Sequence, residues 1–83
     1  MRATVLVRPK EGILDPQGEA VGDALRQLGF VVGAARIGRV VDLELDATDA
    51  ETARGVLERM CEQLLANPLI ESYEIELREN GGS

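Results

Sequence analysis

The spacing of apolar residues changes along the chain between the period of a strand and the period of a helix. Residues 3–8 alternate, which places Ala3, Val5 and Val7 on one face. In residues 48–68 the apolar side chains instead recur at helical spacing, at Ala50, Ala53, Leu57, Met60, Cys61 and Leu64. Alternation is typical of a strand covered on one side, and the second pattern predicts an amphipathic helix. Both patterns in one chain indicate layers of helix on sheet.

The first helix is predicted within residues 9–30. Asp15 can cap its start, Pro16 suits the first helical position, and Gly29 ends it. The apolar stripe of this helix consists of Ala20, Val21, Ala24, Leu25 and Leu28. We therefore expect one face of this helix to pack on the sheet.

The second helix has a start signal and a stop signal. Thr48 followed by Glu51 forms a capping box. Asn67 tolerates a left-handed conformation and Pro68 cannot continue a helix, so the pair predicts a stop. A last strand follows, with Tyr73 among its inward side chains.

Residues 30–46 are rich in β-branched residues and contain Gly38 near their middle. A hairpin at Gly38 gives two strands, whereas a bend gives one long strand that two protomers can share; the sequence leaves both open. The expected order is βαββαβ, an α+β ferredoxin-like two-layer sandwich with two helices on one face of the sheet. We expect a single domain over residues 1–79 and a flexible tail over residues 80–83.

Composition excludes several classes of function. A net charge of −6 is unfavourable for binding nucleic acid. No run resembles a leader or a membrane span, so we expect no membrane association and a cytoplasmic location. Cys61 is the single cysteine and there is no histidine, so we expect no disulfide and no zinc or iron–sulfur site. Asp42, Glu44 and Asp46, and likewise Glu74 and Glu76, alternate with apolar residues, which is typical of a solvated strand face and not of a site for a hard cation. Without a histidine base, a glycine-rich phosphate loop or an activated serine or cysteine, we expect no catalytic residue and no bound cofactor in this chain.

Three stretches together resemble the PurS family, the small subunit of phosphoribosylformylglycinamidine (FGAM) synthase. They are GILDPQGEAV, which holds Asp15, Pro16 and Gly18, then ARIGRVVDLEL, and finally MCEQLLANPLIESYEIE. The family usually has a basic residue after the central glycine, and Arg39 fits this pattern. The resemblance extends from the first strand through Glu76.

This resemblance implies a three-part amidotransferase. A glutaminase subunit, PurQ, releases ammonia, and a large synthetase subunit, PurL, binds ATP and magnesium and joins the nitrogen to formylglycinamide ribonucleotide. The small subunit is non-catalytic and bridges the other two. We also expect this chain to associate with itself as a dimer or tetramer, because the β-rich edge in residues 30–41 invites pairing with a second copy. The candidate interface residues in this chain are Arg36, Gly38, Arg39, Glu71 and Tyr73.

Two other functions are compatible with the same fold. A regulatory module would bind a small ligand between protomers, and Gly12 and Gly18 lie where its glycine-rich turn would be. An acylphosphatase-like hydrolase would need an arginine in a phosphate-binding loop after the first strand. Here Pro9, Lys10 and Glu11 follow Arg8 instead.

Overall fold

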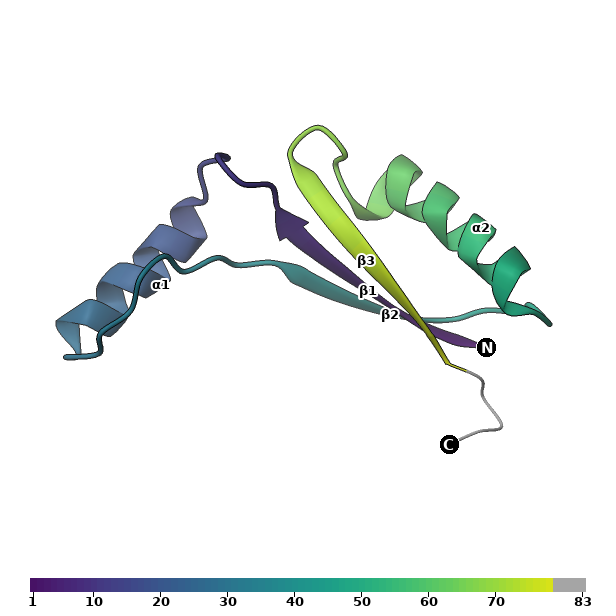
Figure 1. Ribbon diagram of the computed structural model, residues 1–83, viewed down its shortest axis with the longest axis horizontal. Coiled ribbons are helices and arrows are strands. Elements are labelled where there is room, and N and C mark those ends of the chain that lie inside the picture. The colour runs from purple at the N-terminus through teal and green to yellow at the C-terminus, as the bar shows by residue number, and fades with distance from the viewer. Residues whose placement is uncertain (79–83) are drawn as a thin grey trace.

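The computed structural model describes residues 1–78. Its elements are β1 (Arg2–Pro9), α1 (Pro16–Gln27), β2 (Arg39–Glu44), α2 (Ala50–Met60), a π-helical turn η1 (Cys61–Leu65) and β3 (Glu71–Arg78) (Figure 1). Residue 79 of the expected domain and the expected tail 80–83 lie outside these described residues. The α+β arrangement of helix on antiparallel sheet is confirmed.

The sheet has β1 at its centre, in the order β2-β1-β3, and both pairings are antiparallel. Val5 lies opposite Val41 on one side and Ile75 on the other. Because alternate residues share a face, Ala3, Val5 and Val7 point the same way, and all three are buried. The alternating pattern of the first strand therefore predicts the apolar face correctly.

Helix α2 covers this apolar face and closes the core. Ala53, Leu57 and Cys61, spaced four residues apart, are completely buried. Leu57 and Cys61 join the strand residues in one cluster. The predicted stripe of the second helix is thus confirmed at these three residues. Met60 is half-buried, and the prediction is wrong for Ala50 and Leu64, which are exposed.

Asp49, and not Thr48, caps α2. Its carboxylate accepts a hydrogen bond from the Thr52 backbone N–H at 2.7 Å and another from the Thr52 hydroxyl at 3.0 Å. The predicted capping box of Thr48 with Glu51 is wrong by one residue. An aspartate in the cap position also places negative charge at the positive end of the helix, which stabilises it further.

Replacing Asp49 with alanine should lower the melting temperature by roughly 4 to 8 °C, because an N–H group at the start of α2 loses its acceptor. Thr48→Ala is the matched control and should leave the melting temperature nearly unchanged. Thermal unfolding followed by circular dichroism compares the two variants. A larger decrease in melting temperature for Thr48→Ala than for Asp49→Ala would instead identify Thr48 as the cap residue.

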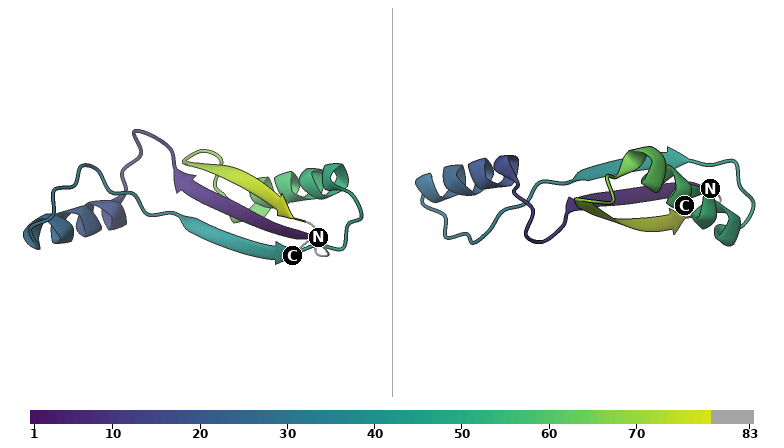
Figure 2. Two further views of the ribbon diagram at one scale, coloured as in Figure 1. Left: turned by 60° about the horizontal axis from the view of Figure 1, so that its bottom comes forward. Right: turned by 90° about the horizontal axis from the view of Figure 1, so that it is seen from above.

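Helix α1 begins and ends as predicted but does not lie on the sheet. Asp15 accepts a hydrogen bond from the Gly18 N–H at 3.0 Å, Pro16 is the first helical residue, and Gly29 has a φ of 98°. The helix lies beyond the end of the sheet, reached by extended chain (Figures 1 and 2). Its stripe is largely exposed, with Val21 and Leu28 among the exposed apolar residues. The expectation that both helices of one chain cover the same sheet face is therefore wrong.

Residues 30–38 form no strand with another part of the described chain. Of the two alternatives at Gly38, the hairpin is absent from this segment, and β2 is a single strand preceded by extended backbone. The Arg26 guanidinium holds the segment against α1 by donating to the carbonyl oxygens of Val32 and Gly33 at 3.3 and 3.0 Å. Helix α1 and residues 30–38 therefore form one arm, named here the α1 arm.

Candidate functional site

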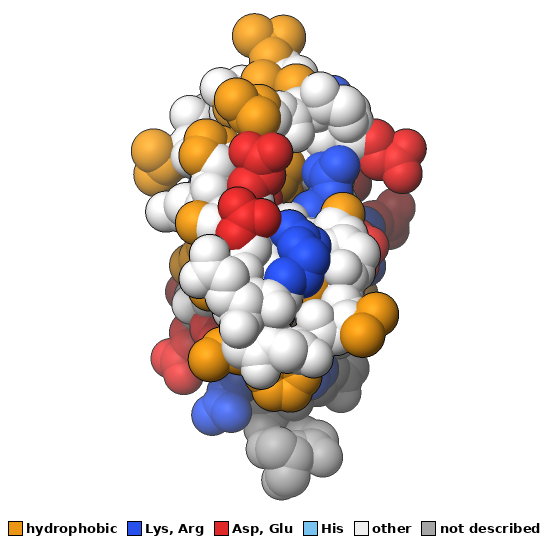
Figure 3. Space-filling model, turned by 90° about the vertical axis from the view of Figure 1, so that its left-hand side faces the viewer, with side chains coloured by type: hydrophobic (Ala, Val, Ile, Leu, Met, Phe, Trp, Pro, Cys, Tyr) orange, Lys and Arg blue, Asp and Glu red, His pale blue; other side chains and the backbone are white. Residues whose placement is uncertain are grey.

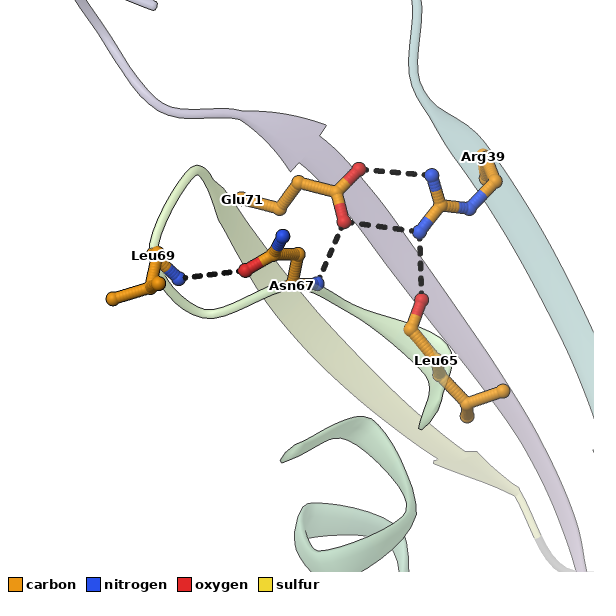
Figure 4. A network of polar contacts seen from close by, with 5 residues as sticks. All are labelled: Arg39, Leu65, Asn67, Leu69 and Glu71. Atoms are coloured by element: carbon orange, nitrogen blue, oxygen red, sulfur yellow. Dashed lines mark hydrogen bonds and ion pairs between the residues drawn. The ribbon is translucent and has the colours of Figure 1, made fainter. Parts of the chain in front are cut away.

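The turn between η1 and β3 is tied to the start of β2 (Figure 4). The Arg39 guanidinium donates to both Glu71 carboxylate oxygens, at 2.8 and 3.1 Å. It also donates to the Leu65 carbonyl oxygen at 2.7 Å. Bidentate pairing of this kind fixes geometry as well as charge. Residues 66–71, named here the corner, are thus fixed against a strand more than 25 positions away in sequence.

Asn67 organises the corner from within. Its amide oxygen accepts from the Leu69 N–H at 3.1 Å, and its carbonyl oxygen accepts from the N–H groups of Ile70 and Glu71. Its own N–H donates to the Glu71 carboxylate at 2.7 Å. The helix ends here as predicted, but for another reason, because no residue other than glycine has a positive φ among residues 1–78. Asn67 acts through its hydrogen bonds.

Lys10 connects the corner to the end of β1. Its ammonium donates to the Pro68 carbonyl oxygen at 2.7 Å, and its backbone N–H donates to the Ile70 carbonyl oxygen at 2.9 Å. The sequence alone did not identify Lys10 or Leu65 as contacts of the corner. Both act across large sequence separations, and Leu65 acts through its backbone, so no local pattern identifies them.

The pairing of Arg39 with Glu71 shifts both acid–base equilibria. The Arg39 hydrogen bonds, followed by the bond from the Asn67 N–H, hold the pKa of Glu71 below its ordinary value. The same hydrogen bonds raise the pKa of Arg39. Both effects favour the charged forms, so the ion pair persists at neutral pH.

Glu71→Gln should remove part of the acid sensitivity of the fold. Because the pKa of Glu71 is lowered by folding, its contribution to stability is complete above the ordinary carboxyl pKa and is lost as the pH falls through the lowered value. The stability difference between wild type and Glu71→Gln should therefore shrink as the pH is lowered. Urea unfolding across the acid range measures it, and a difference that grows toward low pH would contradict the assignment.

Arg36 and Asp15 fix the point where the α1 arm leaves the sheet. The Arg36 guanidinium donates to the carbonyl oxygens of Pro9 and Lys10 at 3.3 and 3.1 Å. The second carboxylate oxygen of Asp15 accepts from the Ile37 N–H at 2.9 Å. This bond, followed by the one from the Gly18 N–H, lowers the pKa of Asp15. Asp15 therefore both caps α1 and holds the extended segment.

Four of the five predicted interface residues gather at one end of the sheet. Arg36, Gly38, Arg39 and Glu71 all lie where β1 ends and where β2 and β3 begin. Tyr73 instead lies half-buried against the core cluster, where burial raises its pKa. Arg39, one of the candidate interface residues, pairs through its guanidinium with Glu71 of its own chain.

The acidic, thiol and hydroxyl groups of the described residues have the following surroundings. In residues 1–78 no three histidine, cysteine or acidic side chains come together to hold a metal ion, and no helix there is long and apolar enough to cross a membrane. Burial raises the pKa of the Cys61 thiol, which keeps it protonated. On the open sheet face the Asp42 carboxylate accepts from the Thr4 hydroxyl at 2.7 Å, and that hydroxyl accepts from Arg78.

The surface carries many large apolar side chains for so small a protein. They are Leu14, Val21, Leu28, Phe30, Val31, Ile37, Val40, Leu64, Leu69 and Ile70. In the view toward the left-hand end of Figure 1, where α1 lies, hydrophobic side chains stand out around the rim with acidic and basic groups between them (Figure 3). Exposed apolar surface of this extent is typical of a subunit that binds other proteins.

Comparison with known proteins supports this interpretation. A family model described as PurS, phosphoribosylformylglycinamidine (FGAM) synthase, matches residues 2–79. The PurS subunit of FGAM synthase from Synechocystis sp. is 47% identical over 77 residues, covering 92% of this chain and 75% of that protein. The structure of PurS from Bacillus subtilis superposes with a TM-score of 0.84 at 39% identity, covering 94% of this chain and 98% of that one. A chain in the structure of PurLQS from Thermotoga maritima gives a TM-score of 0.83 at 33% identity, covering 90% and 93%. The chain belongs to the PurS family of FGAM synthase subunits.

Proposed function

We propose that this chain is a non-catalytic bridging subunit of FGAM synthase in de novo purine biosynthesis. It joins a glutaminase subunit, PurQ, to a synthetase subunit, PurL, so that ammonia from glutamine reaches formylglycinamide ribonucleotide. The observation that carries this proposal is the similarity, over nine-tenths of the chain, to a chain of the PurLQS structure.

A bridge contributes to this reaction by geometry. Ammonia in open water is protonated at neutral pH and diffuses away. Its transfer between two active sites therefore requires that the two subunits be held in a fixed relative position and that water be excluded from the route. ATP and magnesium belong to the synthetase subunit in this proposal. This chain supplies contacts only.

The self-association in this proposal is an exchange of α1 arms between two copies. In one chain β2 is an edge strand of the sheet, and residues 30–38 are extended without a strand partner in the described chain. Two such strands, running antiparallel past each other near Gly38, would each give the other sheet its missing strand. The order βαββαβ is then completed by two chains.

The same exchange accounts for the exposed stripe of α1. On the helix-covered side of β2, Val41, Leu43 and Leu45 are only half-buried, as are Val56 and Met60 of α2. Helix α1 of a second copy would cover these side chains with its own apolar stripe. Burial of both surfaces contributes about 25 cal/mol for each Å² of apolar area. Each protomer thereby completes the core of its partner.

The alternative of a regulatory module that binds a small ligand between protomers remains a prediction. Gly12, with a φ of 84°, does make the turn after β1, but its surroundings are open. Calorimetry with amino acids tests this alternative directly.

Assembly in solution tests the bridging proposal. The purified chain, mixed with the synthetase and glutaminase subunits from the same organism, should form one complex that holds all three. Alone, it should have at least twice the mass of the 9.0 kDa chain by light scattering. A monomer at micromolar concentration would contradict the exchange, and failure to join the two larger subunits would contradict the bridge.

A further inference from the structure

The helix and the extended segment of the α1 arm pack closely enough to move as one body. Gly18 and Gly22 of α1 are buried and lie against Ala35. A Cβ atom at Gly18 would come within 2.3 Å of the Ala35 carbonyl oxygen, so only glycine lets the first turn of α1 approach the segment this closely. The apolar stripe of the helix is left free, since Val21 and Leu28 are exposed.

Two connections join the arm to the sheet. Residues 10–15 lead from β1 into α1. On the return path the Ile37 N–H donates to the Asp15 carboxylate at the start of α1, whereas Arg39 is already the first residue of β2. Gly38 is therefore the whole of the second connection.

The first connection is long enough for α1 to fold back over the sheet of its own chain, an arrangement named here the closed chain. Connections of about 2 to 6 residues between a strand and a helix are common, and residues 10–15 lie within this range. Gly12, with a φ of 84°, already provides a turn. The first connection therefore does not prevent the closed chain.

The second connection does prevent it. In the closed chain residues 30–38 would turn back tightly beside β2, and the tight turns that join two antiparallel strands need a positive φ. Among residues 1–78 only Gly12 and Gly29 have one, so the backbone passes Gly38 without such a turn. Gly38 also lies directly on the Val7 carbonyl oxygen, from which a Cβ atom would be only 2.3 Å away.

Arg36 fixes the direction of the arm next to Gly38. Its guanidinium donates to the carbonyl oxygens of Pro9 and Lys10, at the end of β1. In the closed chain residues 30–38 would lie at the free edge of β2, and β2 would then separate them from β1. Closing would therefore break both of these hydrogen bonds. Gly38 and Arg36 are named here the joint.

We propose that the joint prevents α1 from covering the sheet of its own chain and thereby commits the arm to a second copy. This inference rests on the exchange of arms in the proposed function and names the residues that decide between exchange and the closed chain. A short connection that does not reverse favours exchange, because the helix then reaches an uncovered sheet only in another copy. Since helix and segment are one body, the second copy receives both together.

A crosslink between α1 and α2 reports which sheet the helix covers. Val21→Cys and Val56→Cys place one thiol on the exposed stripe of α1 and one on the half-buried side of α2. Cys61 is buried and does not compete for a short bis-maleimide reagent. Exchanged arms give covalent dimers on a denaturing gel, whereas the closed chain gives single chains whose mass shows an internal link. The chain with its natural joint should give mainly covalent dimers.

Insertion of Asn-Gly after Gly38 supplies the missing turn and should change the main product to internally linked single chains. The matched control is the same insertion after Gly12, in the connection that already allows closing. It should still give covalent dimers. Circular dichroism of both insertion variants checks that they are folded.

Arg36→Met tests the joint without changing the length of the chain. Loss of two hydrogen bonds from a charged donor should raise the share of internally linked chains by about threefold or more. Arg8→Met is the control, because Arg8 pairs with Glu74 within the sheet and does not span the joint. It should leave the share unchanged. If Arg36 only contacted the second copy, its loss would give single chains without an internal link.

The outcomes separate the joint from the exchange itself. Internally linked chains from the natural joint would overturn the exchange and the joint together. Covalent dimers from the natural joint and equally from the Gly38 insertion would overturn the joint and leave the exchange intact. Equal closing by both insertions would overturn the assignment to Gly38. The Arg36→Met comparison decides if an insertion variant does not fold, and an unchanged share of internally linked chains in it would then overturn the joint.

Discussion

Replacing Leu57 with alanine should lower the free energy of unfolding by about 2 to 5 kcal/mol. Leu57 is the largest side chain that is completely buried, and it lies with Val5, Val7 and Cys61 in the cluster between α2 and the sheet. Its removal leaves a cavity that the surrounding strands cannot fill without moving. Native domains have a total stability of only about 5 to 15 kcal/mol, so the loss is a large fraction of it.

Urea unfolding of wild type and variant measures this loss. Leu64→Ala is the control, because Leu64 belongs to the same predicted stripe but is 84% exposed in η1. It should change stability by no more than about 0.5 kcal/mol. Equal losses in the two variants would mean that the buried face of α2 is misassigned.

Gly38→Val should destabilise the fold by about 1 to 3 kcal/mol or more. A Cβ atom at Gly38 would lie 2.3 Å from the Val7 carbonyl oxygen, which is backbone and cannot rotate away. The β1–β2 ladder begins beside this contact, where Val7 pairs with Arg39. The variant must therefore move one strand or the other, and we expect the start of β2 and the exit of the α1 arm to loosen together.

Gly55→Ala is the matched control for the glycine prediction. Gly55 lies within α2, and a Cβ there would meet no atom within 4 Å. Alanine should stabilise this helix by roughly 0.5 to 1 kcal/mol. Comparable stability of Gly38→Val and wild type in thermal melts would show that the strands separate without cost.

The parts of the fold that follow from sequence are those with a local cause. Alternation in β1 and four-residue spacing in α2 specify their buried faces without reference to the rest of the chain. Helix α1 likewise begins at Asp15 and Pro16, as the sequence predicts. The Thr48 prediction failed because two adjacent residues can both cap a helix, and only the backbone conformation at Asp49 decides between them.

The parts of the fold that the sequence did not predict depend on residues far away in the chain or on a second chain. The stripe on α1 indicates that this helix packs on an apolar surface, but it does not say to which chain that surface belongs. The Arg39–Glu71 pair joins residues 32 positions apart, and the π-helical turn η1 that brings Leu65 to it has no sequence signature. Conversely, Arg36, Gly38 and Arg39 lie close together because they are nearly consecutive in sequence. Their role as an interface stays a prediction.

The most direct test of the bridging role is to omit this chain from the reconstituted synthase and to supply nitrogen in two ways. The rate of FGAM formation is measured with glutamine and, separately, with a high concentration of free ammonia. If the chain holds the two larger subunits in register, glutamine-dependent synthesis should be lost while ammonia-dependent synthesis survives, because bulk ammonia needs no delivery route. Undiminished glutamine-dependent synthesis without the chain, or equal loss of both activities, would contradict the bridge.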